Sequence, residues 1–144
     1  MTTLKKVEDR LGIIAILLPK IFERRLMDEA YSLLVQHHDC GPFDGGCVVF
    51  ARALQLAYGG NIEVLVGSVT AGYLPQALHA VLHVGSMYGD ADGFATKHHL
   101  IARFQKAELL SGGRVSSVRP ILSNDLPDAP RDEALSKQIA EIIQ

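Results

Sequence analysis

The sequence predicts an α+β fold, and three features of the chain indicate it. Val48 to Tyr58 is expected to be a helix that is apolar on almost every side and is closed by Gly59 and Gly60. Segments rich in β-branched residues and leucine follow it, and they predict strands. Amphipathic helices are expected before and after this block. The apolar helix should therefore lie at the centre of the core, packed against a sheet.

The elements are expected in the following order. Thr3 to Leu18 begins as a helix that Pro19 interrupts, and Ile21 to Gln36 has the spacing of an amphipathic helix. A loop rich in glycine, proline and aspartate separates it from the apolar helix. The other expected elements are strands at 63–69, 78–84 and 87–90, a helix at 94–110, a strand at 115–120 and an amphipathic helix at 132–143.

Length and composition exclude several classes of function. The chain has 144 residues, 48% of them hydrophobic, and a net charge of −2, so we expect one domain over residues 1–144. Without a Lys/Arg-rich run, nucleic acid is not an expected partner. The strongest apolar run, Leu11 to Pro19, is too short to span a bilayer, so no membrane partner is expected. Two cysteines, Cys40 and Cys47, suit a reduced protein, and we expect a cytoplasmic location.

Cys47 lies where the apolar helix begins, directly after Gly45 and Gly46. The free N–H groups and partial positive charge at a helix N-terminus lower the pKa of a thiol, and the thiolate is the nucleophile. The glycines would let a substrate approach the sulfur closely. The alternative is a buried cysteine with only a structural role, because cysteine is among the most buried residue types.

A β-hairpin downstream carries the groups that could activate this thiol. A two-residue turn at Gly85-Ser86 would set His83 opposite Tyr88 and His79 opposite Asp92, with Asp90 diagonal to His79. All of these side chains would then project from the same face of the sheet. Either aspartate could orient the imidazole of His79. A slip of one residue in the turn would separate the histidines from the aspartates.

The segments Gly45-Gly46-Cys47-Val-Val-Phe-Ala-Arg-Ala-Leu and His79-Ala-Val-Leu-His-Val…Met-Tyr-Gly-Asp90-Ala-Asp-Gly93 resemble the papain-like cysteine peptidase superfamily, especially its transglutaminase-like and small bacterial peptidase-like branches. The resemblance implies a papain-like core in which a central helix begins at the nucleophile and packs on an antiparallel sheet, with flanking helices. It makes Cys47 the nucleophile, His79 the base and Asp90 the orienting group. The second histidine, His83, and Tyr88 would line the core or support the site.

The chain departs from the papain pattern before the cysteine. Papain-like enzymes usually place a side-chain donor there, often glutamine, to complete the oxyanion hole, whereas this chain has Asp44. An ionised aspartate only accepts hydrogen bonds, so Asp44 is better explained as a helix cap or loop residue. The Cys47 N–H can supply one donor, and His38 is the candidate for the second.

These residues predict a cysteine hydrolase, a peptidase or amidase that forms an acyl-enzyme on Cys47, with a peptide or amide-containing substrate and no cofactor. A transglutaminase-like acyltransferase would use the same residues. The same scaffold could instead serve as a non-catalytic interaction or effector module. A zinc site is the remaining class, but no metal is expected, because the usual spacings are absent. Its ligands would come from His37, His38, Asp39, Cys40, Cys47, His79 and His83.

Overall fold

In the computed structural model, which describes residues 24–70, 72–108 and 112–144, five strands form one sheet in the order β4-β3-β2-β1-β5. Every pair of neighbouring strands is antiparallel. The strands are β1 (Asn61–Thr70), β2 (Gln76–Val84), β3 (Met87–Asp90), β4 (Gly93–Ala95) and β5 (Gly112–Pro120). The helices are α3 (Arg24–His38), α4 (Cys47–Tyr58), α5 (Lys97–Glu108) and α6 (Glu133–Ile143). The expected α+β class is confirmed.

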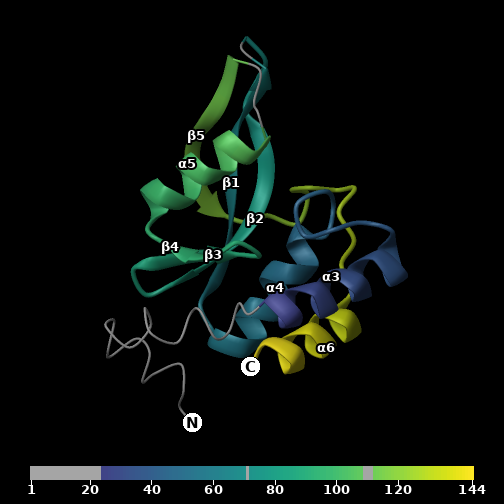
Figure 1. Ribbon diagram of the computed structural model, residues 1–144. Coiled ribbons are helices and arrows are strands. Elements are labelled where there is room, and N and C mark those ends of the chain that lie inside the picture. The colour runs from purple at the N-terminus through teal and green to yellow at the C-terminus, as the bar shows by residue number, and fades with distance from the viewer. Residues whose placement is uncertain (1–23, 71, 109–111) are drawn as a thin grey trace.

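The helix α4 is the centre of the larger core, as its composition predicts. It packs between the sheet and the pair α3 and α6, and Figure 1 shows these three helices together on one side of the sheet. Phe50 and Leu54 of α4 are fully buried there with residues of α3, α6 and β2. The hydroxyl of Ser136 in α6 donates to the carbonyl of Val49 at 2.9 Å, which ties the two helices together inside the core.

The helix α5 covers the opposite face of the sheet (Figure 1). Its residues Leu100 and Phe104, one helical turn apart, are buried against Leu65, Val81 and Tyr88 of the strands. The sheet therefore has an α4 face and an α5 face. In β2, Val81 belongs to the cluster on the α5 face, and His79 stacks on Phe104 of α5.

The hairpin between β2 and β3 has the expected turn and register. Val84 pairs with Met87 and His83 with Tyr88, and Gly85 has a φ of 59°, in the region that favours glycine. The predicted continuation to Asp92 is wrong, because β3 ends at Asp90, which pairs with Gly93 of β4 instead. Gly93, with a φ of 108°, follows the tight turn through which the chain reverses.

The expected helix at 94–110 begins later than predicted. Phe94 lies in the short strand β4, and α5 begins at Lys97, where the hydroxyl of Thr96 accepts the N–H of His99 as an N-terminal cap. The predicted helix at 21–36 is observed as α3 within the described residues. The segment Thr3 to Leu18 lies outside the described residues. No helix among the described residues combines the length and the apolar character that a membrane crossing requires.

Candidate active site

Cys47 is the first residue of α4, and the loop before it is held by its own backbone. The N–H of Gly46 donates to the carbonyl of Gly41 at 2.8 Å, and the carboxylate of Asp44 accepts the N–H of Gly41. Asp44 therefore fixes the loop and does not cap α4. No side chain of the described residues caps this helix, and the N–H of Cys47 makes a hydrogen bond with the Cys47 sulfur.

The sulfur of Cys47 lies at the edge of β2, at the place where β3 turns away. β3 pairs with β2 only at Leu82, His83 and Val84, so it does not reach Ala80. The Ala80 N–H instead donates to the sulfur of Cys47. Cys47 is 7% exposed and packs with Ala80 and Val64 in the cluster under α4.

The imidazole of His79 is enclosed on both sides by aromatic rings. Phe43, from the loop before α4, stacks on it with ring centroids 5.2 Å apart, and Phe104 of α5 stacks on it at 4.9 Å. Its Nε2 lies 3.1 Å from Oδ2 of Asp90, and the ring is 1% exposed. Because Nε2 faces the carboxylate, Nδ1 is the ring nitrogen left for the hydrogen bond that His79 makes with Cys47.

His79 and Cys47 approach each other from opposite faces of the sheet. His79 pairs with Leu65, which belongs to the cluster under α5, whereas Cys47 belongs to the cluster under α4. They meet at the edge of β2 because the chain turns after Asp90 into β4, so that none of the strands in the described part of the chain pairs with that edge beside Ala80. The early end of β3 thus makes room for the thiol.

The three groups shift one another's pKa values. Burial alone would raise the pKa of Cys47, but the hydrogen bond and charge of His79, with the N–H of Ala80, lower it below its ordinary value. Burial likewise opposes the charged form of His79, yet its bonds to Asp90 and Cys47 raise its pKa to about 9. The pKa of Asp90 is lowered by His79 and Arg103 against the effect of burial. These directions favour a thiolate and an imidazolium held by a carboxylate.

Arg103 of α5 completes the surroundings of Asp90. Its Nη2 donates to Oδ1 of Asp90 at 2.7 Å and to the carbonyl of Gly93 at 2.5 Å. The sequence pattern did not single out this residue, because only the placement of α5 over the sheet brings it to Asp90. The adjacent Phe104, on the buried side of α5, is the one local signal that Arg103 lies near the sheet.

Asp92 and His83 do not take the positions that would make them alternatives to Asp90 and His79. Asp92 donates its backbone N–H to Oδ1 of Asp90 at 2.9 Å, and its exposed side chain lies in the turn, not opposite His79. The Nδ1 of His83 lies 2.7 Å from Oε2 of Glu63. Its ring stacks on Tyr88 at 4.1 Å, so His83 and Tyr88 form a separate pair on the hairpin.

His38, the expected second oxyanion donor, is engaged elsewhere. Its Nε2 lies 2.8 Å from Oδ2 of Asp132, whose other oxygen caps α6 by accepting the N–H of Leu135. This pair joins the end of α3 to the start of α6. The second oxyanion donor is better sought among the backbone N–H groups of the first turn of α4, which make no intrahelical hydrogen bond. Within residues 24–70, 72–108 and 112–144 there is no group of three or more side chains arranged to hold a metal ion.

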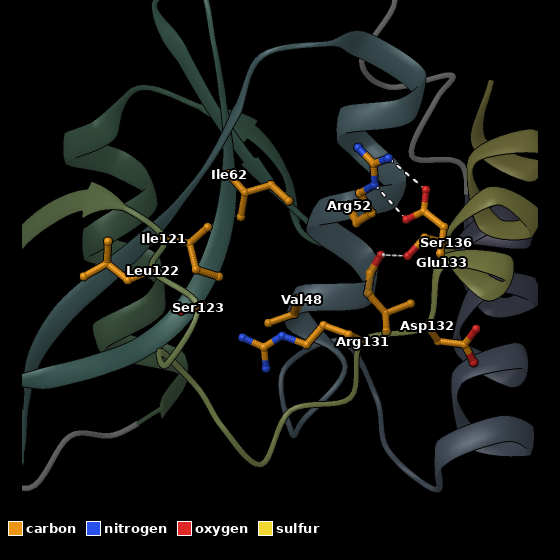
Figure 2. A pocket seen from close by; sticks show the side chains of 11 residues that line it. Val48, Arg52, Ile62, Ile121, Leu122, Ser123, Arg131, Asp132, Glu133 and Ser136 are labelled. Atoms are coloured by element: carbon orange, nitrogen blue, oxygen red, sulfur yellow. Dashed lines mark hydrogen bonds and ion pairs between the residues drawn. The ribbon is translucent and has the colours of Figure 1, made fainter.

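A pocket of about 510 Å³ lies beside α4, between the start of β1, the segment after β5 and the start of α6. Figure 2 shows Ile62, Ile121 and Leu122 along one side and Arg52, Glu133 and Ser136 along the other. The guanidinium of Arg52 makes two hydrogen bonds to Glu133, at 2.8 and 2.9 Å. Cys47, His79 and Asp90 are not among the residues that line this pocket.

Comparison of the chain with protein-family models, with curated proteins and with solved structures found no match.

Proposed function

We propose that the protein is a cysteine hydrolase, a peptidase or amidase, in which Cys47, His79 and Asp90 act together on a peptide or amide substrate. The proposal depends on one observation: a thiol with a lowered pKa at a helix N-terminus interacts with a histidine whose other ring nitrogen is held 3.1 Å from a buried carboxylate. A papain-like arrangement, with the central helix beginning at the nucleophile, is part of the same proposal.

The pKa directions define how the reaction would begin. Because His79 favours the ionised form of the thiol, the Cys47 thiolate attacks the carbonyl carbon directly and forms a C–S bond. The His79 imidazolium then gives its proton to the leaving amine as the C–N bond breaks, which leaves a thioester on Cys47. Asp90 holds the imidazole in the tautomer and orientation that this transfer needs.

The second half of the reaction reverses these roles. Neutral His79 takes a proton from a water molecule, whose oxygen attacks the thioester carbonyl. The thiolate of Cys47 leaves, and the imidazolium is restored. The oxyanion that forms in both halves would lie against the backbone N–H groups of the first turn of α4, which no side chain caps and where the helix dipole also favours negative charge. An amine in place of water would give acyl transfer with the same residues.

The burial of the site favours a second candidate, a non-catalytic module with the same three residues. Cys47 is 7% exposed and His79 1%, and the ring of Phe43 covers the imidazole. A hydrolase must therefore open the loop 41–46 to admit its substrate. The module would keep the site closed and use the residues only for packing.

Alkylation of Cys47 by iodoacetamide as a function of pH tests the proposal. The experiment uses the Cys40→Ala variant, so that Cys47 is the only thiol of the chain. We expect the alkylation rate to rise with an apparent pKa below the ordinary thiol value of about 8.5. His79→Ala should raise that pKa by about one unit or more, since it removes the imidazolium. Asp90→Asn should act in the same direction, and Asp92→Asn should have little effect.

Turnover is tested with an activated ester, p-nitrophenyl acetate, followed by intact-mass spectrometry. An acetyl group should appear on the Cys40→Ala variant and be absent once Cys47 is also replaced by alanine. A thiol that titrates at its ordinary value, unaffected by His79→Ala, would contradict the hydrolase. An acidic thiol that forms no acetyl-enzyme with any activated ester would favour the non-catalytic module.

A further inference from the structure

We infer that Arg103 is a positioning residue of the candidate active site. It holds the carboxylate of Asp90 in the orientation in which Oδ2 faces His79. The inference rests on the proposed function and extends it from three residues to four. Arg103 touches neither Cys47 nor His79 in any contact described, so it would act entirely through Asp90. Its part is therefore to set the geometry of the acid, not to take part in bond making.

The division of the carboxylate oxygens carries the argument. Oδ1 of Asp90 accepts from Arg103 Nη2 at 2.7 Å and from the N–H of Asp92 at 2.9 Å, and Oδ2 faces His79 Nε2 at 3.1 Å. A carboxylate on an aspartate can rotate about its Cβ–Cγ bond unless both oxygens are engaged. With Oδ1 held by two donors, Oδ2 has only the imidazole to face.

The same amino group of Arg103 also ties Asp90 to the neighbouring strand. Nη2 donates to the carbonyl of Gly93, the residue that pairs with Asp90 across the turn from β3 to β4. The turn that ends β3, and leaves room for Cys47 at the edge of β2, is thus held by the side chain that orients the acid. The next residue of α5, Phe104, stacks on His79, so two consecutive residues support the histidine and the aspartate.

The burial of one nitrogen of the Arg103 guanidinium is further support for a specific role. Its Nε is buried and has no hydrogen-bond partner among the described residues, and a buried donor without a partner costs free energy. Three charged groups face Asp90: His79 on β2, Arg103 on α5 and Asp92 in the turn. The carboxylate of Asp92 repels that of Asp90, so His79 and Arg103 are the two cationic groups that hold the Asp90 carboxylate in place.

The test is a double-mutant cycle of Arg103→Gln and Asp90→Asn in the Cys40→Ala background, with the pH profile of iodoacetamide alkylation as readout. Arg103→Gln alone should raise the apparent pKa of the Cys47 thiol by about one unit, which lowers the alkylation rate at neutral pH by roughly tenfold. In the Asp90→Asn background it should change the profile no further, because the group through which it acts is gone. An equal effect in both backgrounds would overturn the positioning role.

Two further variants separate positioning from general stability. Arg103→Lys keeps a positive charge and N–H donors, so its profile should lie between those of wild type and Arg103→Gln. A lysine profile no closer to wild type than that of glutamine would overturn the inference, even if Arg103→Gln folds poorly. Arg52→Gln is the matched control, because it breaks the arginine–carboxylate pair between Arg52 of α4 and Glu133 of α6, which involves none of the three site residues. It should leave the thiol profile unchanged.

The failure of this inference differs from the failure of the proposed function. An acidic, His79-dependent thiol whose profile is the same in Arg103→Gln would overturn the role of Arg103 and leave the hydrolase proposal in place. A thiol that titrates at its ordinary value in the otherwise wild-type chain would overturn both.

Discussion

The aromatic rings around His79 are the feature of single residues that most directly governs access to the thiol. Phe104 belongs to a buried helix face, whereas Phe43 belongs to a half-buried loop between glycines. Of the two, Phe43 is the ring that can move away from the imidazole. Opening the site must break the stack of Phe43 on His79. Such aromatic pairs stabilise the folded structure by about 0.5–1.5 kcal/mol.

We therefore predict that Phe43→Ala makes Cys47 more accessible. The alkylation rate of the thiolate, measured at a pH above the thiol pKa, should rise roughly two- to tenfold, which is the rate equivalent of losing one aromatic stack. Tyr73→Ala is the control, because Tyr73 is an aromatic residue that is 71% exposed at the far end of the β1–β2 hairpin. An unchanged rate in Phe43→Ala would mean that this ring does not limit access.

At the level of single residues, the sequence predicted the contact between His79 and Asp90, but it did not predict where the strand pairing ends or that Arg103 joins the contact. The glycine turn set the register of the hairpin, and a diagonal neighbour of His79 on the same face followed from strand geometry. The strand expected at 87–90 has the observed bounds of β3, but its pairing with β2 was extended beyond Asp90 to Asp92, where the chain already turns into β4. Arg103 was missed since its contact with Asp90 exists only through the docking of α5 on the sheet.

Among the elements, β1 shows how local irregularity shapes the sheet near the site. Its pairing with β2 shifts between Leu65 and Val66, and its pairing with β5 shifts between Val66 and Gly67. The first shift lies next to the residue that pairs with His79. A Cβ on Gly67 would lie 2.2 Å from the carbonyl oxygen of Arg114, so the two strands approach too closely for any other residue.

Gly67→Ala should consequently lower the free energy of unfolding by about 1–3 kcal/mol, the usual cost of added atoms in a packed site. Urea unfolding followed by circular dichroism measures this difference. Ser117→Ala, on the strand β5 that faces this part of β1, is exposed and adds no atoms, so it should stay within about 0.5 kcal/mol of wild type. A Gly67→Ala protein as stable as Ser117→Ala would show that the strands can separate without cost.

Periodicity predicted the long elements well and the short ones poorly. The apolar helix α4 was expected from Val48 to Tyr58 and begins one residue earlier, because its composition and the closing glycines leave few alternatives. The three-residue strand β4 was assigned to a helix, since three residues carry too little pattern to distinguish the two states. Thr96 was the available signal for the true start of α5.

For the whole molecule, the order of strands is the property that sequence reasoning could not supply. β1 to β4 are neighbours in the order of the chain, but β5 returns past α5 to pair with β1 on the other edge. This return puts the segment after β5 against the core, where Leu126 and Ala129 pack on the cluster that contains Cys47. The packing of Cys47 thus depends on a connection more than seventy residues further along the chain.

The segment after β5 is held by an ion pair, which should make the free energy of unfolding decrease at acid pH. Arg119, near the end of β5, bonds both oxygens of Asp125 at 2.6 and 2.9 Å, and the N–H of Leu122 donates to the same carboxylate at 2.7 Å. The arginine first, and then the backbone donor, lower the pKa of Asp125 from 3.8 to about 2. A carboxyl whose pKa is lower in the folded state stabilises the fold above its unfolded value, and this contribution is lost as the pH falls.

The predicted window for this loss runs from about pH 4 down to about pH 2, between the unfolded and folded pKa values of Asp125. Asp125→Asn should be less stable than wild type at neutral pH, and its free energy of unfolding should fall less steeply across that window. Some acid dependence should persist in the variant, because the pKa of Asp90 is lowered in the same direction. Urea unfolding at a series of pH values measures both slopes.

The matched control for this prediction is Asp28→Asn, which removes an exposed carboxylate from α3. Asp28 lies 4.0 Å from Arg24, and both side chains are largely in solvent, so this pair should contribute little to stability. Its acid slope should follow that of wild type.

Parallel slopes in wild type and Asp125→Asn would mean that the Arg119 pair does not hold the segment after β5. The packing of Leu126 and Ala129 near Cys47 would then depend on another interaction. The nearest one is that of Arg131, whose guanidinium donates to the carbonyls of Asp125, Leu126 and Ala129 and depends on no carboxylate in these bonds.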